Sequence, residues 1–316
     1  MIITLTPNPS IDRTAVLATP LVRGAVHRLE SVSTQAAGKG VNISRAAVIA
    51  GVETVALLPA STDDPYVASL LADHIPVEAV PPAGAVRINL SVVEPDGTTT
   101  KLNSPGDRVD EADLNALRDA LVRHASAART SDWVVLAGSV PPGTPAEWYA
   151  ELVQILRRTP PRIAVDTSDA PLLALIAGLP ASAPDLIKPN GAELASLTGA
   201  DPDALEANPA AVAEAARGLV TRGIGHVLAT LGGNGAVLVT SDGAWHASAP
   251  PIDVVSTVGA GDSSLFGYLY GSEQNLSPAE SLAFAVAYGS AADSLPGTTI
   301  PSPSHTHPEL AHVRQL

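Results

Sequence analysis

A short glycine-rich segment in the C-terminal part of the chain combines residue types that suit phosphoryl transfer. Residues 256–262 (STVGAGD) lead directly into a helix-compatible run. Bare backbone amides and the helix dipole at such a helix start attract anions. Gly259, Ala260 and Gly261 could therefore stabilise charge on a transferred phosphoryl group, while Asp262 accepts the proton of the attacking hydroxyl. An ordinary glycine-rich loop before a helix with an acidic first turn has the same pattern, so this segment alone leaves both interpretations open.

A second segment, residues 36–47 (AAGKGVNISRAA), again places small residues at the start of a helix. Small residues permit a substrate to approach closely, Lys39 offers a positive charge, and Asn42 is expected on the first helical turn, facing the same cavity. The spacing is not that of a P-loop, which requires Gly, four residues and then Gly-Lys-Ser/Thr. Taken alone, Lys39 could also be a solvated surface lysine.

Two further segments indicate nucleotide contacts. Residues 186–194 (LIKPNGAEL) predict a strand that ends at a proline, followed by a helix with Asn190 and Glu193 on one face. This amide and carboxylate could hold magnesium-bound water near phosphates, or they could form a capping box, and the two roles are compatible. Residues 230–236 (TLGGNGA) predict a strand, a turn and a second strand whose glycines allow contact with a nucleotide phosphate, although a bare hairpin is an equal alternative.

The elements that must position these segments alternate along the chain. Apolar, β-rich runs predict strands at Ile2–Thr6, Thr54–Leu58, Trp133–Ala137, Arg162–Asp166, Asp185–Lys188, His226–Thr230 and Ala236–Thr240. Helical patterns between them lie at Gly40–Ala50, Glu111–Ala125, Pro145–Arg157, Ala210–Arg222 and Pro278–Ala292. This alternation predicts an α/β fold with a parallel sheet covered on both faces. Ligands bind beyond the carboxyl ends of the strands in such sheets, which is where the glycine-rich segments fall.

Two stretches interrupt the alternation, at residues 11–34 and 86–103, where β-branched and polar residues interleave. The sequence Pro-Asp-Gly at 95–97 predicts a hairpin turn in the second stretch. We expect both stretches to form a small β-sheet, a discontinuous lid on a single α/β domain that spans residues 1–316, and irregular surface hairpins are the alternative. The tail after Thr299, rich in Pro, Ser and His, is expected to be a loosely held terminus.

Composition narrows the classes of function. The formal net charge of −14 disfavours nucleic acid and anionic membranes as partners. No apolar run is long enough to span a membrane, and the first residues lack the pattern of a signal peptide. The absence of cysteine excludes disulfides and Cys-ligated metal sites, and we expect a cytoplasmic protein. Because Lys and Arg total only 18, an anionic substrate requires a local cluster of them.

In combination and in this order, the four segments resemble those of the ribokinase-like (PfkB) carbohydrate kinase family, over nearly the whole chain. Residues 6–13 (TPNPSIDR), the Gly-Lys-Gly at 38–40 and residues 138–143 (GSVPPG) are similar to its phosphosugar kinase branch, which includes 1-phosphofructokinase and tagatose-6-phosphate kinase. Residues 103–106 (NSPG) add to the similarity with 1-phosphofructokinase. The resemblance implies a Rossmann-like three-layer sandwich with a small β-sheet lid, often clasped against the lid of a second subunit in a homodimer.

The resemblance also implies ATP with Mg²⁺ as donor and a phosphosugar as acceptor, with fructose 1-phosphate converted to fructose 1,6-bisphosphate. It makes Asp262 the base and residues 259–261 the anion hole. The substrate-binding residues that it implies are Asp12, Gly38, Lys39, Asn42, Arg87, Lys101, Asn103 and Ser139. The residues that it places against ATP are Lys188, Asn190, Glu193, Thr230, Gly232, Gly235, Thr257 and Gly289, and Glu193 would hold Mg²⁺ through water.

By the same resemblance, Lys39, Arg87 and Lys101 would grip the phosphate that the substrate already carries. Arg87 and Lys101 fall on the two strands of the predicted hairpin, and an arginine can bind a phosphate with two parallel hydrogen bonds. A surface salt bridge is the alternative for Arg87. The purine is expected near Val254 and Val286, where small apolar side chains leave a slot.

Several rival activities remain open on the sequence. Kinases of the same family that act on tagatose 6-phosphate, fructose 6-phosphate, a nucleoside or an unphosphorylated sugar share these motifs, and the three basic residues argue against the last two. A non-catalytic sugar-phosphate sensor would need no base, so the intact Gly259–Asp262 run disfavours it. An NAD-dependent dehydrogenase is disfavoured because no Gly-x-Gly-x-x-Gly follows the first predicted strand.

Overall fold

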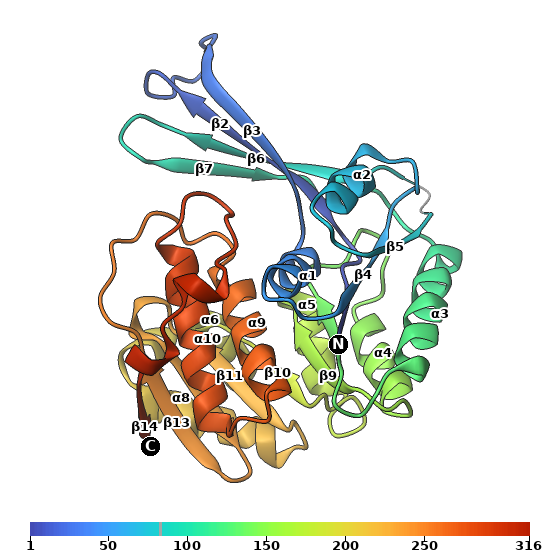
Figure 1. Cartoon of the computed structure of the whole chain (residues 1–316), viewed down its shortest axis with the longest axis vertical. Helices are drawn as coiled ribbons and strands as arrows, with labels where there is room; N and C mark the ends of the chain where they lie inside the picture. Colours follow the sequence, from blue (N-terminus) through green and yellow to red (C-terminus); the bar gives the residue numbers. More distant parts are fainter. Residues whose placement is uncertain (82–83) are drawn as a thin grey trace.

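The computed structural model describes residues 1–81 and 84–316, which form a large and a small β-sheet with surrounding helices (Figure 1). Within these residues the large sheet has ten strands, in the order β14-β13-β12-β11-β10-β9-β8-β1-β4-β5. They are β1 (Ile2–Leu5), β4 (Thr54–Pro59), β5 (Val77–Val80), β8 (Trp133–Ala137), β9 (Arg162–Asp166), β10 (Leu186–Ile187), β11 (His226–Thr230), β12 (Ala236–Thr240), β13 (Gly243–Ser248) and β14 (His312–Gln315). All seven strands that the sequence predicts are among them.

The large sheet is parallel from β5 to β11 and antiparallel from β11 to β14. The expectation of a parallel sheet is therefore wrong at one edge. Parallel neighbours need a crossover of a dozen or more residues, whereas β12 and β13 are joined by a tight turn, which permits only an antiparallel pair. The predicted fold class, an α/β layered fold with a small additional sheet, is confirmed.

The C-terminal tail is held within the fold. Strand β14 pairs with β13, and Ile300 and Thr306 are buried. The prediction of a loosely held terminus is therefore wrong. A composition rich in Pro and Ser indicates a loop, but an open sheet edge offers unpaired backbone groups that a short strand can satisfy, and composition does not reveal that pairing.

Helices cover both faces of the large sheet. The helices α1 (Lys39–Ile49), α9 (Ala260–Glu273) and α10 (Pro278–Asp293) pack on one face. The other face carries α3 (Glu111–Ala127), α4 (Trp148–Leu156), α5 (Asp169–Ala177), α6 (Gly191–Thr198) and α8 (Pro209–Thr221), with α7 (Pro202–Ala207) beside α6 and α8. The remaining elements are α2 (Pro65–Ala72), which contacts β5, and the 3₁₀ turns Gly232–Asn234, Pro303–His305 and Pro308–Leu310. No helix among the described residues is long and apolar enough to cross a bilayer.

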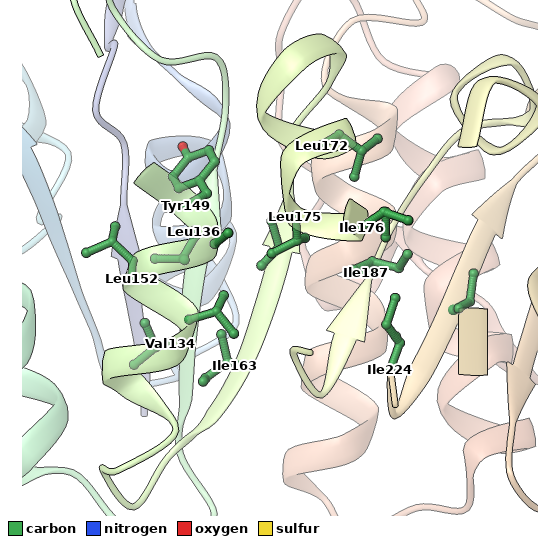
Figure 2. Packing of buried hydrophobic residues seen from close by; sticks show 14 of the residues in the cluster. Val134, Leu136, Tyr149, Leu152, Ile163, Leu172, Leu175, Ile176, Ile187 and Ile224 are labelled. Atoms are coloured by element: carbon green, nitrogen blue, oxygen red, sulfur yellow. The ribbon is translucent and has the colours of Figure 1, made fainter. Parts of the chain in front are cut away.

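The central strands are buried on both faces, which explains why they are continuous apolar runs. In β8, Val134 and Leu136 point to one core and Trp133 and Val135 to the other. Figure 2 shows the first core, where Leu152 and its neighbours on α4 and α5 pack against the strands. Because the interiors of these strands are packed mainly with apolar side chains, functional side chains are expected where the strands end.

The small sheet projects beyond the large one (Figure 1) and has the order β3-β2-β6-β7. Its strands are β2 (Ser10–Leu17), β3 (Leu29–Ala37), β6 (Arg87–Val93) and β7 (Thr99–Asn103). Asp12 is in register with Asn89, and Asn89 with Asn103, so these polar residues share one face. Ile88 and Leu102 lie on the opposite face by the same alternation. The sheet therefore has a polar side and an apolar side.

Candidate active site

Four charged residues from distant parts of the chain meet at the carboxyl edge of the large sheet. Asp166 ends β9, Lys188 follows β10, Lys39 begins α1, and Asp262 lies in the first turn of α9. The sequence analysis singled out three of them but missed Asp166. One feature of the sequence indicates a role for Asp166: it is an acidic residue at the end of a predicted buried strand.

Asp166 bridges the two lysines. Nζ of Lys39 lies 2.9 Å from Oδ1 of Asp166, and Nζ of Lys188 lies 3.4 Å from Oδ2. Burial alone would raise the pKa of the fully buried Asp166 carboxyl, but Lys188 and Lys39 outweigh that effect and hold the pKa below its usual value. For Lys39, burial opposes the charged form, yet Asp166 and then Asp262 raise its pKa above the ordinary value. Both groups are therefore ionised at neutral pH.

The start of helix α9 forms an open corner with exposed backbone. Gly259 adopts φ +83°, a left-handed conformation that favours glycine, and a Cβ there would meet open space. The first amides of the helix lack intrahelical acceptors. A Cβ at Gly261 would lie 3.3 Å from Nζ of Lys188, so this amine points at the same corner. Backbone amides and an ammonium group thus converge on one position.

Asp262 lies beside this corner and is only 7% exposed. Its Oδ2 accepts a hydrogen bond of 2.8 Å from Nδ2 of Asn42. Burial, followed by the nearby charge of Asp166, raises the pKa of Asp262 to about 6, while Lys39 and the Asn42 hydrogen bond oppose the rise. A carboxyl group with a pKa near the operating pH is suited to take up a proton during a reaction.

The polar face of the small sheet adds a second group of side chains. Oδ1 of Asp12 accepts hydrogen bonds from Oγ of Ser10 at 2.8 Å and from Nδ2 of Asn89 at 3.1 Å. Both donors converge on one oxygen, which fixes the orientation of the carboxylate. Oδ1 of Asn89 is buried without a hydrogen-bond partner among the described residues. Sequence reasoning missed Asn89, because a polar residue in an alternating strand resembles an ordinary solvated position.

Arg87 begins strand β6 and is half-buried. It donates hydrogen bonds to the carbonyl oxygen of Ser104 at 2.9 Å and to Oγ of Ser139 at 3.4 Å, whereas its Nε is buried without a partner among the described residues. Burial lowers the pKa of the Arg87 guanidinium, and Asp12 partly opposes this. The structure therefore brings Arg87, Asp12 and Ser139 together, as the sequence predicts, and Arg87 has no salt bridge to any residue in the ranges 1–81 and 84–316.

Lys101 does not join this group. It is exposed on β7 opposite Ser91, which lies four residues beyond Arg87 along β6. At ~3.3 Å per residue this separation is roughly 13 Å. Asn103 lies nearer, opposite Asn89, and Gly38 immediately precedes Lys39. A cluster of all three predicted basic residues is therefore absent from the described structure, and a role for Lys101 requires it to reach along the sheet.

A cavity of about 580 Å³ adjoins the α9 corner. Its lining includes eight residues that the sequence analysis placed at the nucleotide or the anion hole: Asn190, Thr230, Gly232, Gly235, Thr257, Ala260, Gly261 and Gly289. Val254 and Val286, expected near the purine, also line it. Sequence reasoning missed Pro251, Ile252 and Ala285, which complete an apolar slot and have no distinctive local pattern.

The comparisons with known proteins agree with this geometry. The model of the pfkB family of carbohydrate kinases matches residues 6–305. This chain belongs to that family. A 1-phosphofructokinase of Rhodobacter capsulatus is 37% identical over 310 residues, covering 96% of this chain and 93% of the relative. A 1-phosphofructokinase of Haloferax volcanii is 36% identical, covering 99% of each chain. The predicted family is therefore confirmed.

Solved structures of PfkB kinases have the same fold. Phosphofructokinase-2 from Escherichia coli, in complex with substrates and products, superposes with a TM-score of 0.86 at 29% identity and covers 96% of each chain. A ribokinase of Arabidopsis thaliana, complexed with ribose and ATP, gives a TM-score of 0.71 at 18% identity, which supports the fold alone.

The capping box predicted for this PfkB kinase at α6 is present. Oδ1 of Asn190 accepts from the amide of Glu193, and Oε2 of Glu193 accepts from the amide of Asn190, both at 2.8 Å. The Glu193 carboxylate also contributes to the raised pKa of Lys39, so its charge faces the site. No group of three or more acidic or histidine side chains among the described residues is arranged to hold a metal directly.

Proposed function

We propose that this PfkB kinase transfers the γ-phosphoryl group of ATP to a hydroxyl group of fructose 1-phosphate, giving fructose 1,6-bisphosphate. The observation that carries this proposal is the position of Asp262. Its carboxylate lies where the amides of α9 and the amine of Lys188 converge, with the large cavity on one side. Two residues of α1, Lys39 and Asn42, also lie next to the Asp262 carboxylate.

In the proposed mechanism the transfer is direct and in line. Asp12 holds the sugar, and Asp262 accepts the proton of the attacking hydroxyl as its oxygen bonds to the γ-phosphorus. The bond from the γ-phosphorus to the ADP oxygen breaks, and ADP leaves. The amides of residues 259–261 and the Lys188 ammonium group stabilise the charge on the phosphoryl oxygens. The contribution of the protein is therefore mainly positioning and electrostatics.

The cavity supports ATP as the donor. Its apolar part, with Ile252, Val254 and Val286, suits a purine, and its glycine-rich part around Gly232 leaves backbone exposed for phosphates. Mg²⁺ would neutralise phosphate charge when bound. It keeps most of its waters in such sites, so Asn190 and Glu193 would hold it through water rather than directly. With ATP as donor, we also propose a cytoplasmic location.

A coupled ADP-release assay with fructose 1-phosphate, fructose 6-phosphate and tagatose 6-phosphate tests the proposal. We expect the highest kcat/KM for fructose 1-phosphate, because the relatives of 33–37% identity are named 1-phosphofructokinase. The superposition on phosphofructokinase-2 favours fructose 6-phosphate as the second candidate. If ADP is released with none of the three sugars, the result would instead support a non-catalytic sensor.

Replacing Arg87 should weaken binding of the phosphorylated sugar. Loss of one charge-assisted contact costs ~1.5–3 kcal/mol, so Arg87→Ala is expected to raise the KM for fructose 1-phosphate by about 10- to 100-fold, at ~1.36 kcal/mol per tenfold change. The KM for ATP should change little. Steady-state kinetics with each substrate varied in turn provides the measurement. An unchanged KM for the sugar would favour an acceptor without a phosphate.

We also propose that the small sheet acts as a lid and that its apolar face pairs with the same face of a second copy. Val32, Ile88 and Leu102 share this face and are 50%, 40% and 56% exposed. Exposed apolar residues gathered on one face are typical of association surfaces. Introducing a charge there, as in Leu102→Asp, should shift the protein from dimer to monomer in light scattering. A wild-type monomer at micromolar concentration would contradict this proposal.

A further inference from the structure

Arg45 is a buried arginine on α1 that the proposed mechanism leaves unused. It is 7% exposed, and its guanidinium group contacts three parts of the structure. Nη1 donates to Oδ1 of Asn42 at 3.3 Å, and Nη2 donates to the carbonyl oxygen of Ala36 at 2.8 Å. Nη2 also lies 3.2 Å from Oδ2 of Asp73, at the end of α2. Such a costly buried charge requires an explanation.

The contact with Asn42 determines which way the amide of Asn42 points. An asparagine amide has an accepting oxygen at one end and donating hydrogens at the other. Arg45 occupies the oxygen end, so the NH₂ end faces Asp262 and donates to Oδ2 at 2.8 Å. The reverse orientation would place the amide oxygen against a carboxylate and the NH₂ group against a guanidinium group, which are two unfavourable contacts.

We propose that Arg45 is a positioning residue for phosphoryl transfer, which acts through Asn42 to hold a hydrogen-bond donor against Asp262. The inference rests on the proposed function, because it assigns this role only if Asp262 is the base. The partners of the Arg45 guanidinium group in the described structure are Asn42, Ala36 and Asp73, so Arg45 acts on Asp262 only through Asn42. The groups that face Asp262 are Lys39 and Asn42 of α1, Asp166 at the end of β9, and Lys188 after β10.

The same guanidinium group ties the base to the root of the small sheet. Ala36 lies next to the last residue of β3, directly before the turn into α1, and its carbonyl is held by Arg45. The next carbonyl, that of Ala37, accepts a hydrogen bond of 2.8 Å from the hydroxyl group of the buried Tyr66. One side chain, that of Arg45, therefore fixes both the orientation of Asn42 and the position of the end of β3, a strand of the small sheet.

The variant Arg45→Met tests the proposal, because methionine fills similar space without donors. The side-chain carboxyl of Asp262 can be followed by carbon NMR in protein labelled at aspartate Cγ, with its resonance assigned by its loss in Asp262→Asn. We expect the pKa of Asp262 to rise by about half a unit to one unit in Arg45→Met, the size that follows from weakening one side-chain hydrogen bond. This readout does not depend on kinase activity, so it separates failure of this inference from failure of the proposed function.

The kinetic counterpart is the pH dependence of kcat at saturating ATP and fructose 1-phosphate. The substrate phosphate has its own ionisation near pH 6, but it is the same for every variant, so differences between variants report the enzyme. In Arg45→Met the loss of kcat should be about threefold to tenfold larger at pH 5.5 than at pH 8. A purely structural role would lower kcat equally at both pH values.

Two matched variants complete the design. Asp73→Asn removes the ion pair at the end of α2 but keeps the contact between Arg45 and Asn42, so it should leave the pKa of Asp262 unchanged. Arg45→Lys keeps the charge with fewer donors and should give a smaller shift than Arg45→Met, which makes it the test variant if Arg45→Met does not fold. An unshifted pKa of Asp262 in the Arg45 variant that folds would overturn the proposal.

Discussion

Asp166→Asn is expected to destabilise the protein by about 3 kcal/mol at pH 8, because removing one partner of a buried ion pair costs ~3–5 kcal/mol. The substitution leaves Lys188 buried without its carboxylate, whereas Lys39 is partly exposed and can be solvated, so the lower end of the range applies. The pKa of Asp166 is lowered in the folded state. The Asp166 carboxylate therefore contributes to the stability of the folded state above its pKa in the unfolded chain, ~3.9. This contribution is lost as the pH falls through its pKa in the folded state.

Urea unfolding of the wild type and Asp166→Asn at pH 8 and at about pH 2.5, well below the unfolded pKa of ~3.9, measures this effect. The difference in the free energy of unfolding should be largest at pH 8 and shrink as the pH falls toward the lower value, where the Asp166 carboxyl takes up a proton. The matched control is Asp169→Asn, three residues further along the chain, where the carboxylate is exposed and contacts only Ser168 in the described structure. Equal stability of wild type and Asp166→Asn at pH 8 would show that the two lysines do not depend on Asp166.

Asp262→Asn is expected to lower kcat by about 10²–10⁴, which is the usual contribution of a general base and corresponds to ~3–5 kcal/mol of transition-state stabilisation. Asparagine has nearly the same shape and can still accept the hydrogen bond from Asn42, so the KM values for both substrates should remain within about threefold of the wild type. Loss of kcat with retained KM is the pattern of a group that acts in the transition state.

The same substitution should make the protein more stable at pH 8. The pKa of Asp262 is raised to about 6 in the folded state, so the wild type loses stability as the pH rises from ~4 to 6 and the carboxyl becomes charged. Asp262→Asn avoids this loss, which amounts to at most about 3 kcal/mol at ~1.36 kcal/mol per pKa unit. The gain should disappear at pH 4. A destabilised Asp262→Asn at pH 8 would show that the carboxylate is stabilised by its surroundings.

The sequence was sufficient to predict the family, the fold class and most of the residues around the site. Apolar runs defined the central strands because β8 and its neighbours are buried on both faces. Residues at the carboxyl ends of different parallel strands, such as Lys188 and Thr230, lie at one edge of the sheet, so their proximity follows from topology. The glycine-rich start of α9 has a local pattern that requires no knowledge of tertiary contacts.

The residues that sequence reasoning missed depend on contacts between distant segments. Asp166 is a single acidic residue with two lysine partners. Lys39 lies 127 residues before it, and Lys188 follows the next strand, β10. Asn89 and Arg45 have the local patterns of an ordinary strand and an ordinary helix. Strand β14 follows a stretch rich in Pro, Ser and His and pairs with the open edge of β13. In each case the tertiary environment, which no local pattern encodes, gives the residue its role.

The rate of the chemical step in Asp262→Asn tests the central claim most directly. Rapid-quench measurement of fructose 1,6-bisphosphate formation in a single turnover, with enzyme in excess over fructose 1-phosphate and ATP saturating, isolates phosphoryl transfer from product release. The account predicts a transfer rate at least about 100-fold below that of the wild type, with both substrates still bound. Transfer at the wild-type rate would show that another group activates the hydroxyl and would contradict the role assigned to this carboxylate.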